Sequence, residues 1–222
     1  IGIAEKGMMN AQFRTVSAGG HASAPKAHTP VGILSRACTR VEGNPFKMHI
    51  TRPVAEMFDT LGRHSTFLYR MIFANLWCFG WVLDLLGRSS GGEINALLRT
   101  TVAYTQMEGS SARNVIPPEA KMVANMRLNP ADSVQSALSY LRGVVKDEAV
   151  EITALESCEP SRISQTNCPA WDKVAAAVAQ TWPGCIVSPY LMVQCSDSRH
   201  YGVISDRVYR FSAMDLTAEE RR

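Results

Sequence analysis

The stretch from Ser110 to Pro130, SSARNVIPPEAKMVANMRLNP, predicts a turn followed by a β-strand. Pro117 and Pro118 fix their own φ angles and favour extended backbone in the residues before them. Residues 121–128 then alternate small or apolar side chains with other side chains, which is typical of a strand that buries one face. We therefore expect a half-buried strand here, with the rest of the fold arranged around it.

Two polar side chains beside this strand are suited to binding an anion. Asn114 lies in the turn, and Arg127 lies near the end of the strand. A guanidinium group presents a planar fork of donors that fits a carboxylate with two parallel hydrogen bonds. On these residues alone, a solvated arginine and a turn asparagine are the plainer interpretation, and a carboxylate site is the alternative.

Two further motifs stand before and after this stretch. In GGHASAP, His21 follows two glycines, which let the backbone turn sharply and bring the ring close to a ligand. In CSDSRHY, Ser196, Asp197 and Arg199 follow a predicted strand, where backbone N–H groups and the arginine can meet an anionic ligand. Each motif also has a structural interpretation, because a lone histidine is often merely exposed and an Asp-Arg pair can fix a loop.

NVIPP followed by MRLNP, together with GGHASAP and CSDSRHY, stands in the order and spacing of one enzyme family. Over nearly its whole length the chain resembles the zinc-dependent aminoacylase and carboxypeptidase S family of metallohydrolases. Relatives in that family include succinyl-diaminopimelate desuccinylase and glutamate carboxypeptidase, and the carboxypeptidase S branch is the most similar. Three separate motifs in the right order are far more specific than any one of them.

The resemblance gives roles to the residues of these motifs. It implies that Asn114 and Arg127 hold the free carboxylate of the substrate. In such enzymes the lid histidine, here His21, reaches a catalytic site, commonly that of the partner subunit, and helps to polarise the scissile carbonyl. The Ser-Asp-Ser-Arg segment of CSDSRHY lies near the substrate.

The elements on either side of the central strand predict an α+β fold. Apart from a helical insertion at about residues 46–99, their order is β-α-β-β-α-β, which we interpret as a ferredoxin-like lid domain over residues 1–160. In that layout, four antiparallel strands carry two helices on one face. The predicted elements are the strand Met8–Val16, the helix Val31–Val41, the strands Thr100–Glu108 and Lys121–Leu128, a helix from Asp132 or Ser133 to Val145, and the strand Val150–Leu155.

Residues 161–222 are interpreted as the C-terminal part of an α/β catalytic domain. A helix is predicted over residues 170–181, and strands are predicted over 186–194 and 207–211. This segment is too short to be the whole of such a domain. Because the chain opens on IGIAEKG without an initiator methionine, we expect it to be a fragment of a longer enzyme.

The insertion holds the most apolar segment of the chain, MIFANLWCFGWVLDLL at residues 71–86. A membrane span needs about 20 consecutive apolar residues, and Arg70, Asn75 and Asp84 interrupt this segment. We therefore expect no membrane span, but one helix that is buried against its neighbours or lies at a subunit contact.

No cluster of zinc ligands is evident in the sequence. A two-zinc hydrolase needs His and carboxylate ligands around an open position, with a further Glu as general base. The resemblance implies that two zinc ions bind to the full-length enzyme through ligands outside this chain. The chain by itself is therefore predicted to be inactive.

The composition excludes some other classes of protein. Of the 222 residues, 46% are hydrophobic and 19% are charged, and the formal net charge of +3 comes without any run of basic residues. This balance indicates a globular protein that does not bind nucleic acid. The six cysteines are scattered, with no CxxC pair, which favours free thiols over a disulfide framework.

Two hypotheses about function follow from the sequence. The preferred one is part of a zinc metallohydrolase that cleaves an amide bond next to a free carboxylate, in a peptide or an N-acyl amino acid, and that forms a homodimer through its lid. The alternative is a catalytically inactive ferredoxin-like module used for dimerisation or ligand sensing. An HxD motif and paired glutamates upstream of the chain would favour the enzyme.

Overall fold

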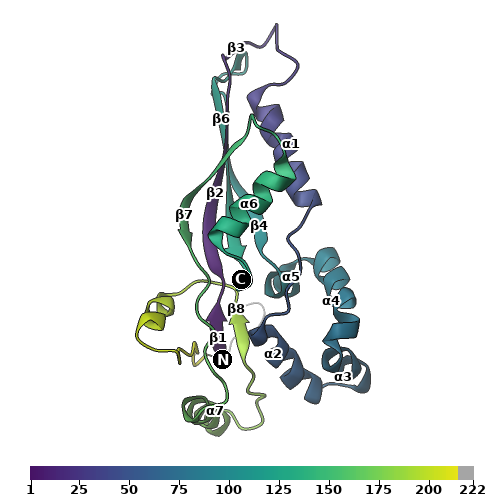
Figure 1. Ribbon diagram of the computed structural model, residues 1–222, viewed down its shortest axis with the longest axis vertical. Helices are drawn as coiled ribbons and strands as arrows, with labels where there is room; N and C mark the ends of the chain where they lie inside the picture. The colour runs from purple at the N-terminus through teal and green to yellow at the C-terminus, as the bar shows by residue number, and fades with distance from the viewer. Residues whose placement is uncertain (215–222) are drawn as a thin grey trace.

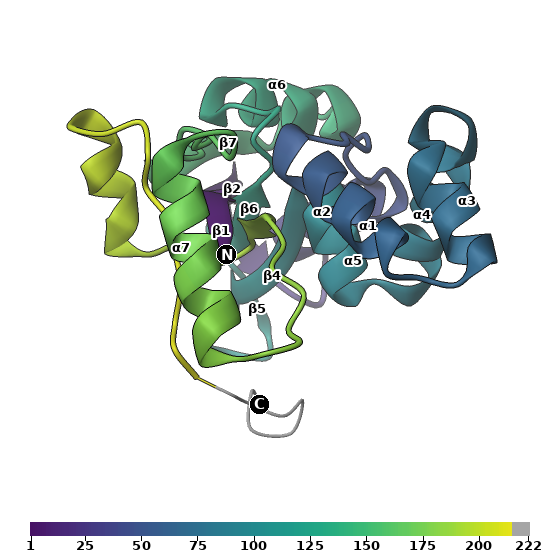
Figure 2. The same ribbon diagram turned by 90° about the horizontal axis from the view of Figure 1, so that it is seen from below.

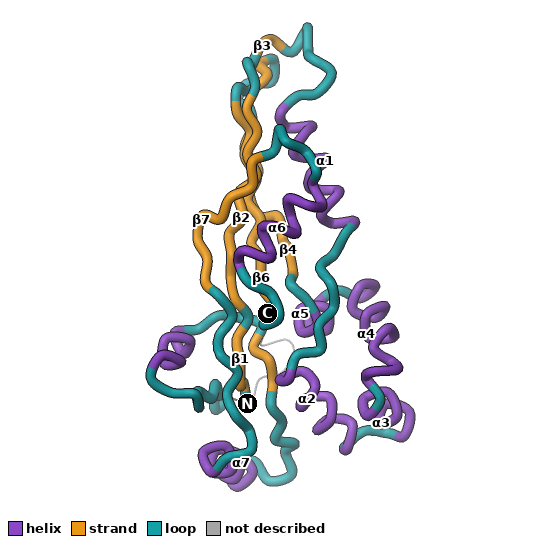
Figure 3. The backbone as a smooth tube through the Cα atoms, viewed as in Figure 1, coloured by secondary structure: helices purple, strands orange, loops and turns teal. Residues whose placement is uncertain are grey.

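The structure is a computed structural model that describes residues 1–214, and the last residues of the predicted C-terminal segment, 215–222, lie outside the described part. Figure 1 shows an elongated molecule whose long sheet has β3 (Gly20–His21) at one end and β1 (Gly2–Glu5) near the other. Most of the helices stand beside the end that carries β1 (Figure 3). The predicted mixture of helices and strands is confirmed.

Four antiparallel strands form the main sheet in the order β4-β6-β2-β7. Their bounds are β2 Gly7–Val16, β4 Thr101–Glu108, β6 Glu119–Leu128 and β7 Glu151–Cys158. Each of the four strands predicted around the central motif is therefore present, within a few residues of its expected limits. Every second residue of β2 and β6 is buried, because one face of the sheet packs against helices.

Two helices, α1 (Pro30–Gly43) and α6 (Val134–Val145), cover that face (Figure 1). Pro30 opens α1, where its missing N–H is not needed. Of the two predicted caps for α6, Ser133 is the one used, and it exchanges hydrogen bonds with Ser136 in a capping box. Large side chains buried between the helices and the sheet include Met9, Phe13, Leu34, Met122, Met126 and Leu141.

Two short strands meet at the far end of the sheet, which we call the tip. There β3 pairs antiparallel with β5 (Val115–Ile116), so that His21 stands opposite Val115. The chain turns into β3 at Gly19, whose φ of +67° lies in the left-handed region that favours glycine. This pairing brings the GGHASAP and NVIPP motifs side by side.

The predicted insertion contains four helices, α2 Arg52–Arg63, α3 Phe67–Ala74, α4 Leu76–Ser90 and α5 Gly92–Leu98. The expectation of one helix that is buried over residues 71–86 is wrong, whereas a subunit contact through this segment stays a prediction. The chain bends by 108° between α3 and α4 at Asn75, whose side-chain amide donates to the carbonyl of Met71 at 2.9 Å and satisfies a carbonyl at the end of α3. Only one side of α4 faces buried neighbours, so its other side is exposed.

Within residues 1–214, no single helix is both long enough and apolar enough to cross a bilayer. The bent pair α3–α4 meets the length and composition requirements only when its two helices are taken together.

At the opposite end from the tip, which we call the base, β1 pairs in parallel with β8 (Tyr190–Met192). The sequence pattern predicts no strand at β1, and it predicts a longer one in place of β8. The predicted helix at residues 170–181 is confirmed as α7 (Pro169–Thr181). The short 3-10 helix η1 (Asp197–Val203) follows β8.

The strand predicted over residues 207–211 is wrong. This segment meets β1 only through one bridge, in which Gly2 and Arg210 exchange backbone hydrogen bonds of 2.8 and 2.9 Å. The next carbonyls along β1 already accept hydrogen bonds from the backbone N–H groups of Ser164 and Ser161. Because that edge of β1 is occupied, no longer ladder forms.

A second core joins the base to the insertion. Its buried side chains come from β1, β8, α2, α4 and α5, and they are Ala4, Val54, Phe58, Leu83, Leu98 and Leu191. The ring of Phe58 stacks on that of Phe73, with a centroid separation of 4.8 Å. The helices of the insertion are therefore fixed against the base by apolar packing.

Candidate functional site

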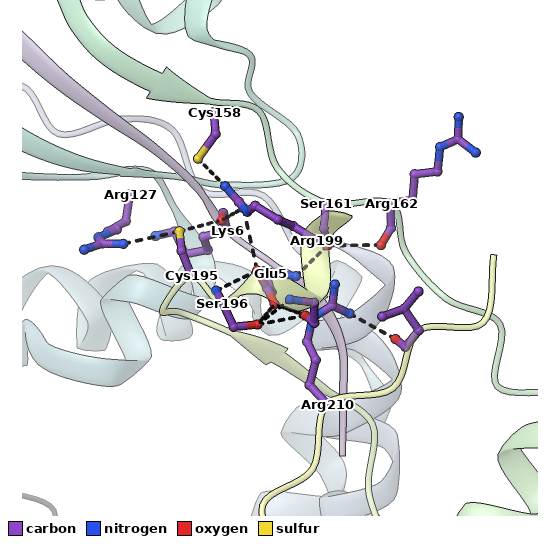
Figure 4. A network of polar contacts seen from close by, with 12 residues as sticks. Glu5, Lys6, Arg127, Cys158, Ser161, Arg162, Cys195, Ser196, Arg199 and Arg210 are labelled. Atoms are coloured by element: carbon purple, nitrogen blue, oxygen red, sulfur yellow. Dashed lines mark hydrogen bonds and ion pairs between the residues drawn. The ribbon is translucent and has the colours of Figure 1, made fainter. Parts of the chain in front are cut away.

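The predicted site residues fall into two groups at opposite ends of the main sheet. His21 and Asn114 lie at the tip, where the N–H of Ala22 donates to the carbonyl of Asn114 at 2.9 Å. Arg127 lies at the other end of β6, beside the segment that contains Ser196 (Figure 4). The strand-end position of both Asn114 and Arg127 is thus as predicted, but the two ends are far apart.

The length of β6 measures this separation. Arg127 comes eight positions after Glu119, and a strand rises about 3.3 Å per residue, so this part of β6 alone spans about 25 Å. Asn114 lies beyond Glu119, past the start of the strand. Within one chain, Asn114 and Arg127 therefore do not contact the same carboxylate.

The ring of His21 is exposed and is oriented by a neighbour in its own loop. Its Nδ1 atom accepts a hydrogen bond from the backbone N–H of Ser23 at 3.2 Å and lies 2.7 Å from the Ser23 hydroxyl. Because Nδ1 acts as the acceptor, the proton of the neutral ring is on Nε2. The tip thus presents an N–H donor of the kind that can stabilise a developing oxyanion.

At the base, Arg127 and Arg199 are linked through the backbone carbonyl oxygen of Lys6, which Arg199 contacts directly and Arg127 reaches through a thiol. Arg127 donates to the thiol of Cys195 at 3.3 Å, and that thiol donates to the Lys6 carbonyl at 3.4 Å. Arg199 donates to the same carbonyl at 3.2 Å and to the thiol of Cys158. Two arginines from separate motifs are thereby brought to one place.

The side chain of Lys6 is completely buried next to this place. Its ammonium group donates to the carbonyls of Ala96 and Arg99, both at 2.8 Å, at the end of α5. Burial, and next the positive charge of Arg127, lowers the pKa of Lys6 to about 7. Burial, more than the neighbouring positive charge, therefore disfavours the charged form of Lys6.

A buried carboxylate, Glu5, organises the segment around η1. It accepts hydrogen bonds from the backbone N–H of Ser196 at 3.1 Å, from the hydroxyls of Ser196 and Ser198, and from Arg210 at 2.6 Å. Arg199 lies 3.7 Å from its other oxygen. Burial raises the pKa of Glu5, but these hydrogen bonds outweigh it and lower the pKa to about 2. Figure 4 shows these side chains converging on Glu5.

The CSDSRHY residues have different positions within this network. Ser196 caps η1 and bonds to Glu5, whereas Asp197 lies exposed at the first position of η1. The ion pair that holds Arg199 among the described residues is with Glu5, not with Asp197. The Asp-Arg pair of the loop-fixing interpretation is therefore not formed, and the acid beside Arg199 comes from β1.

An open hollow of about 740 Å³ lies beside the network, and Ser196, Ser198 and Arg210 are on its wall. Its lining is about equally polar and apolar, and it includes the acid Glu93 as well as Arg210, which pairs with Glu5. Of the arginines at the base, Arg127 is half-buried and has no acidic partner among the described residues. Arg127 is therefore the cation at the base that is most available to a ligand.

Sequence reasoning missed Glu5, Lys6 and Arg210. Glu5 and Lys6 follow a short apolar run and precede Gly7, and a charged pair at the end of such a run is a weak sign of buried polar contacts. Arg210 has no such sign, because its contact with Glu5 depends on a single bridge between distant segments.

The described residues do not by themselves form a metal site. Among residues 1–214, no group of three or more His, Cys, Asp or Glu side chains is placed to hold a metal ion. The chemistry available here is therefore the binding and orientation of an anionic ligand at the base, and hydrogen-bond donation at the tip.

Comparisons with known proteins show similarity along the chain. Residues 3–153 match the family model of the M20 peptidase dimerisation domain. The chain is 31% identical to probable carboxypeptidase S-like 2 of Dictyostelium discoideum, over 97% of this chain and 41% of that protein. It is 33% identical to N-fatty-acyl-amino acid synthase/hydrolase PM20D1 of Xenopus tropicalis, over 99% of this chain and 43% of that protein.

A solved structure is similar in fold. The M20 family metallo-carboxypeptidase Sso-CP2 from Sulfolobus solfataricus superposes with a TM-score of 0.54 at 15% sequence identity, over 90% of this chain and 55% of that one. The chain spans about two fifths of the length of the curated relatives named above.

Proposed function

The chain belongs to the M20 peptidase family, in its carboxypeptidase S-like branch, and from this premise we propose that it is part of a zinc metallohydrolase that cleaves an amide bond next to a free carboxylate. The substrate is a peptide or an N-acyl amino acid. The observation that carries this proposal is that Arg199 directly, and Arg127 through the thiol of Cys195, both reach the Lys6 carbonyl, because two motifs predicted to bind substrate come together there.

Arg127 is proposed to bind the substrate carboxylate. It is half-buried, and its contact with the neutral thiol of Cys195 leaves its charge uncompensated. Burial raises the pKa of that thiol, so it stays protonated beside the guanidinium. Arg199 is partly neutralised by Glu5, and its role is to position the segment with Ser196 at the edge of the same site.

His21 and Asn114 are proposed to act on the site of a second copy. They lie about 25 Å or more from Arg127 along the sheet, which excludes a shared small ligand within one chain. The match to a dimerisation domain and the free edges of the four-stranded sheet support a homodimer through this part of the chain. In such a dimer, the tip of each copy reaches the base of the other.

The domain organisation is part of the same proposal. We infer a ferredoxin-like lid over residues 1–160 with a helical insertion at about 46–99, followed by part of a catalytic domain over residues 161–222. The antiparallel order β4-β6-β2-β7, with two helices on one face, supports the lid. Two zinc ions in the full-length enzyme would activate the attacking water, held by ligands other than the residues described here.

Mixed dimers of the full-length protein test this proposal. His21→Ala and Arg127→Ala homodimers should each be nearly inactive, because every site lacks one group. In a mixed dimer, one site combines an intact tip with an intact base. With random pairing of equal amounts, activity should return to about one quarter of the wild-type value.

The matched control mixes Arg127→Ala with Arg199→Ala, which damages two base positions. No mixed dimer of this pair contains an intact site, so activity should stay low. Equal recovery in both mixtures, or none in either, would contradict the shared site. A wild-type protein that binds carboxylates but hydrolyses no peptide or N-acyl amino acid would instead favour the inactive sensing module.

A further inference from the structure

The outer surface of α3 and α4 exposes an unusual number of large apolar side chains. Trp77 is 87% exposed, Phe67 is 81% exposed and Trp81 is 66% exposed. We call this surface the α3–α4 face, and its exposed large apolar residues are Phe67, Leu68, Tyr69, Met71, Trp77, Trp81, Leu85 and Leu86. Large exposed apolar patches mark interaction sites in soluble proteins.

The fold does not need these side chains for its own core. α4 packs inward through Gly80, Leu83 and Gly87, and α3 packs inward through Phe73, which stacks on Phe58. The helices are therefore held in place by their inner sides. The outer residues remain available to a partner.

The apolar side chains of the α3–α4 face form a stripe on the surface rather than the lining of a pocket. Trp77, Trp81 and Leu85 are four residues apart and form one stripe along α4. The bend of 108° at Asn75 sets α3 at a steep angle to α4, and both helices lie at the outer edge of the molecule, away from α7 (Figures 1 and 2).

One cation of the face has no acidic partner among the described residues. Between residues 59 and 90 the sequence contains three arginines, Arg63, Arg70 and Arg88, and two acids, Asp59 and Asp84. Arg63 forms an ion pair with Asp59, and Arg88 forms one with Asp84, which also pairs with the buried Arg99. Arg70 donates to the backbone carbonyls of Arg63 and Ser65. A second copy of the same face offers no free acid to Arg70, which disfavours self-pairing and favours an anionic partner.

We propose that the α3–α4 face docks on the surface of an anionic phospholipid bilayer. The apolar stripe would lie at the boundary between headgroups and acyl chains, where tryptophan and tyrosine are enriched. Arg70 would contact the lipid phosphates. This inference goes beyond the proposed hydrolase activity and does not depend on it.

The test is co-sedimentation of the full-length protein with vesicles of phosphatidylcholine, with and without phosphatidylserine. The wild-type protein should bind the phosphatidylserine vesicles more strongly, and added salt should weaken that binding. Trp77→Ser combined with Trp81→Ser should lower the partition coefficient by about tenfold or more, because both indoles lose contact with the lipid. Arg70→Glu should lower it by several-fold on anionic vesicles only.

The matched control is Val203→Ser combined with Ile204→Ser, since these residues are 85% and 81% exposed at the end of η1. This variant should bind vesicles like the wild type. Binding that is unchanged in the tryptophan variant would overturn the proposal. So would self-association in vesicle-free solution that the tryptophan variant abolishes, because the face would then be an interface between copies.

Discussion

The tip and the base hold their site residues in different ways. At the tip, His21 is exposed and is oriented by Ser23, two residues away. At the base, Glu5 is fully buried and bonds to Ser196, which lies 191 positions later in the chain. Side chains at the base are thus fixed by the tertiary fold, whereas those at the tip depend on local contacts. Substitutions at the base should therefore change stability, and substitutions at the tip should change activity alone.

The largest expected effect is at Glu5. Glu5→Ala leaves Arg210 and two serine hydroxyls without their buried acceptor, which should lower the free energy of unfolding by about 3–5 kcal/mol. Urea denaturation of the full-length protein measures this. His21→Ala is the comparison, and it should change the free energy by no more than about 0.5 kcal/mol. Equal effects of the two variants would remove the distinction between tip and base.

Lowering the pH should reduce the stability that the Glu5 network gives to the fold, as Glu5→Ala does. The pKa of Glu5 is about 2 in the folded protein, below its ordinary value of 4.5, so its network stabilises the fold fully above about pH 4.5 and is lost as pH falls toward 2. The free energy of unfolding should fall by up to about 3 kcal/mol. Unfolding measured across this range should show a pH dependence that Glu5→Gln reduces. If the free energy of unfolding of Glu5→Gln depends on pH as steeply as that of the wild type, other carboxylates determine the pH dependence.

Arg127 should behave unlike its neighbours at the base. Because it has no acidic partner among the described residues, Arg127→Ala should leave the melting temperature nearly unchanged while kcat/KM falls by about two orders of magnitude, through loss of two charge-assisted hydrogen bonds. Arg127→Lys should restore only part of the activity, since a point charge does not reproduce the fork. Steady-state kinetics and thermal melting of the full-length enzyme separate the two effects. A collapse in melting temperature would show that Arg127 serves the fold.

The smallest effect is expected at Ser23. Ser23→Ala removes the hydroxyl that lies 2.7 Å from Nδ1 of His21, although the backbone N–H of residue 23 can still bond to the ring. We expect kcat to fall by tenfold or less, at a cost of about 1 kcal/mol in the transition state, with unchanged stability. A loss as large as that of His21→Ala would show that the hydroxyl, rather than the backbone, orients the ring.

The sequence predicts the main sheet well because its signal is local. Strands β2 and β6 alternate in burial along their length, and this period of two is visible in the residues themselves. The cap at Ser133 and the proline that opens α1 are local signals of the same kind. The motif residues also lie on the predicted turns and strand ends.

The remaining features depend on contacts between distant segments. The pairing of β1 with β8 joins residues almost 190 positions apart, and only that pairing brings Glu5 to Ser196. The bend at Asn75 is hidden because the surrounding segment is apolar on all sides and shows no period. The separation of Asn114 from Arg127 could have been predicted from the sequence, because a strand of ten residues is already about 30 Å long.

The two attachments of Lys6 have a mechanical consequence. Its ammonium group is fixed to the end of α5, and its carbonyl is fixed to Arg199 and Cys195, while the next residue, Gly7, is packed so closely that a Cβ would lie 2.7 Å from the carbonyl of Cys158. A rotation of β2 relative to β1 must therefore strain the contacts of the Lys6 ammonium group and those of the Lys6 carbonyl together. The contacts of Lys6 therefore tie the orientation of the main sheet to the segment that carries Arg199.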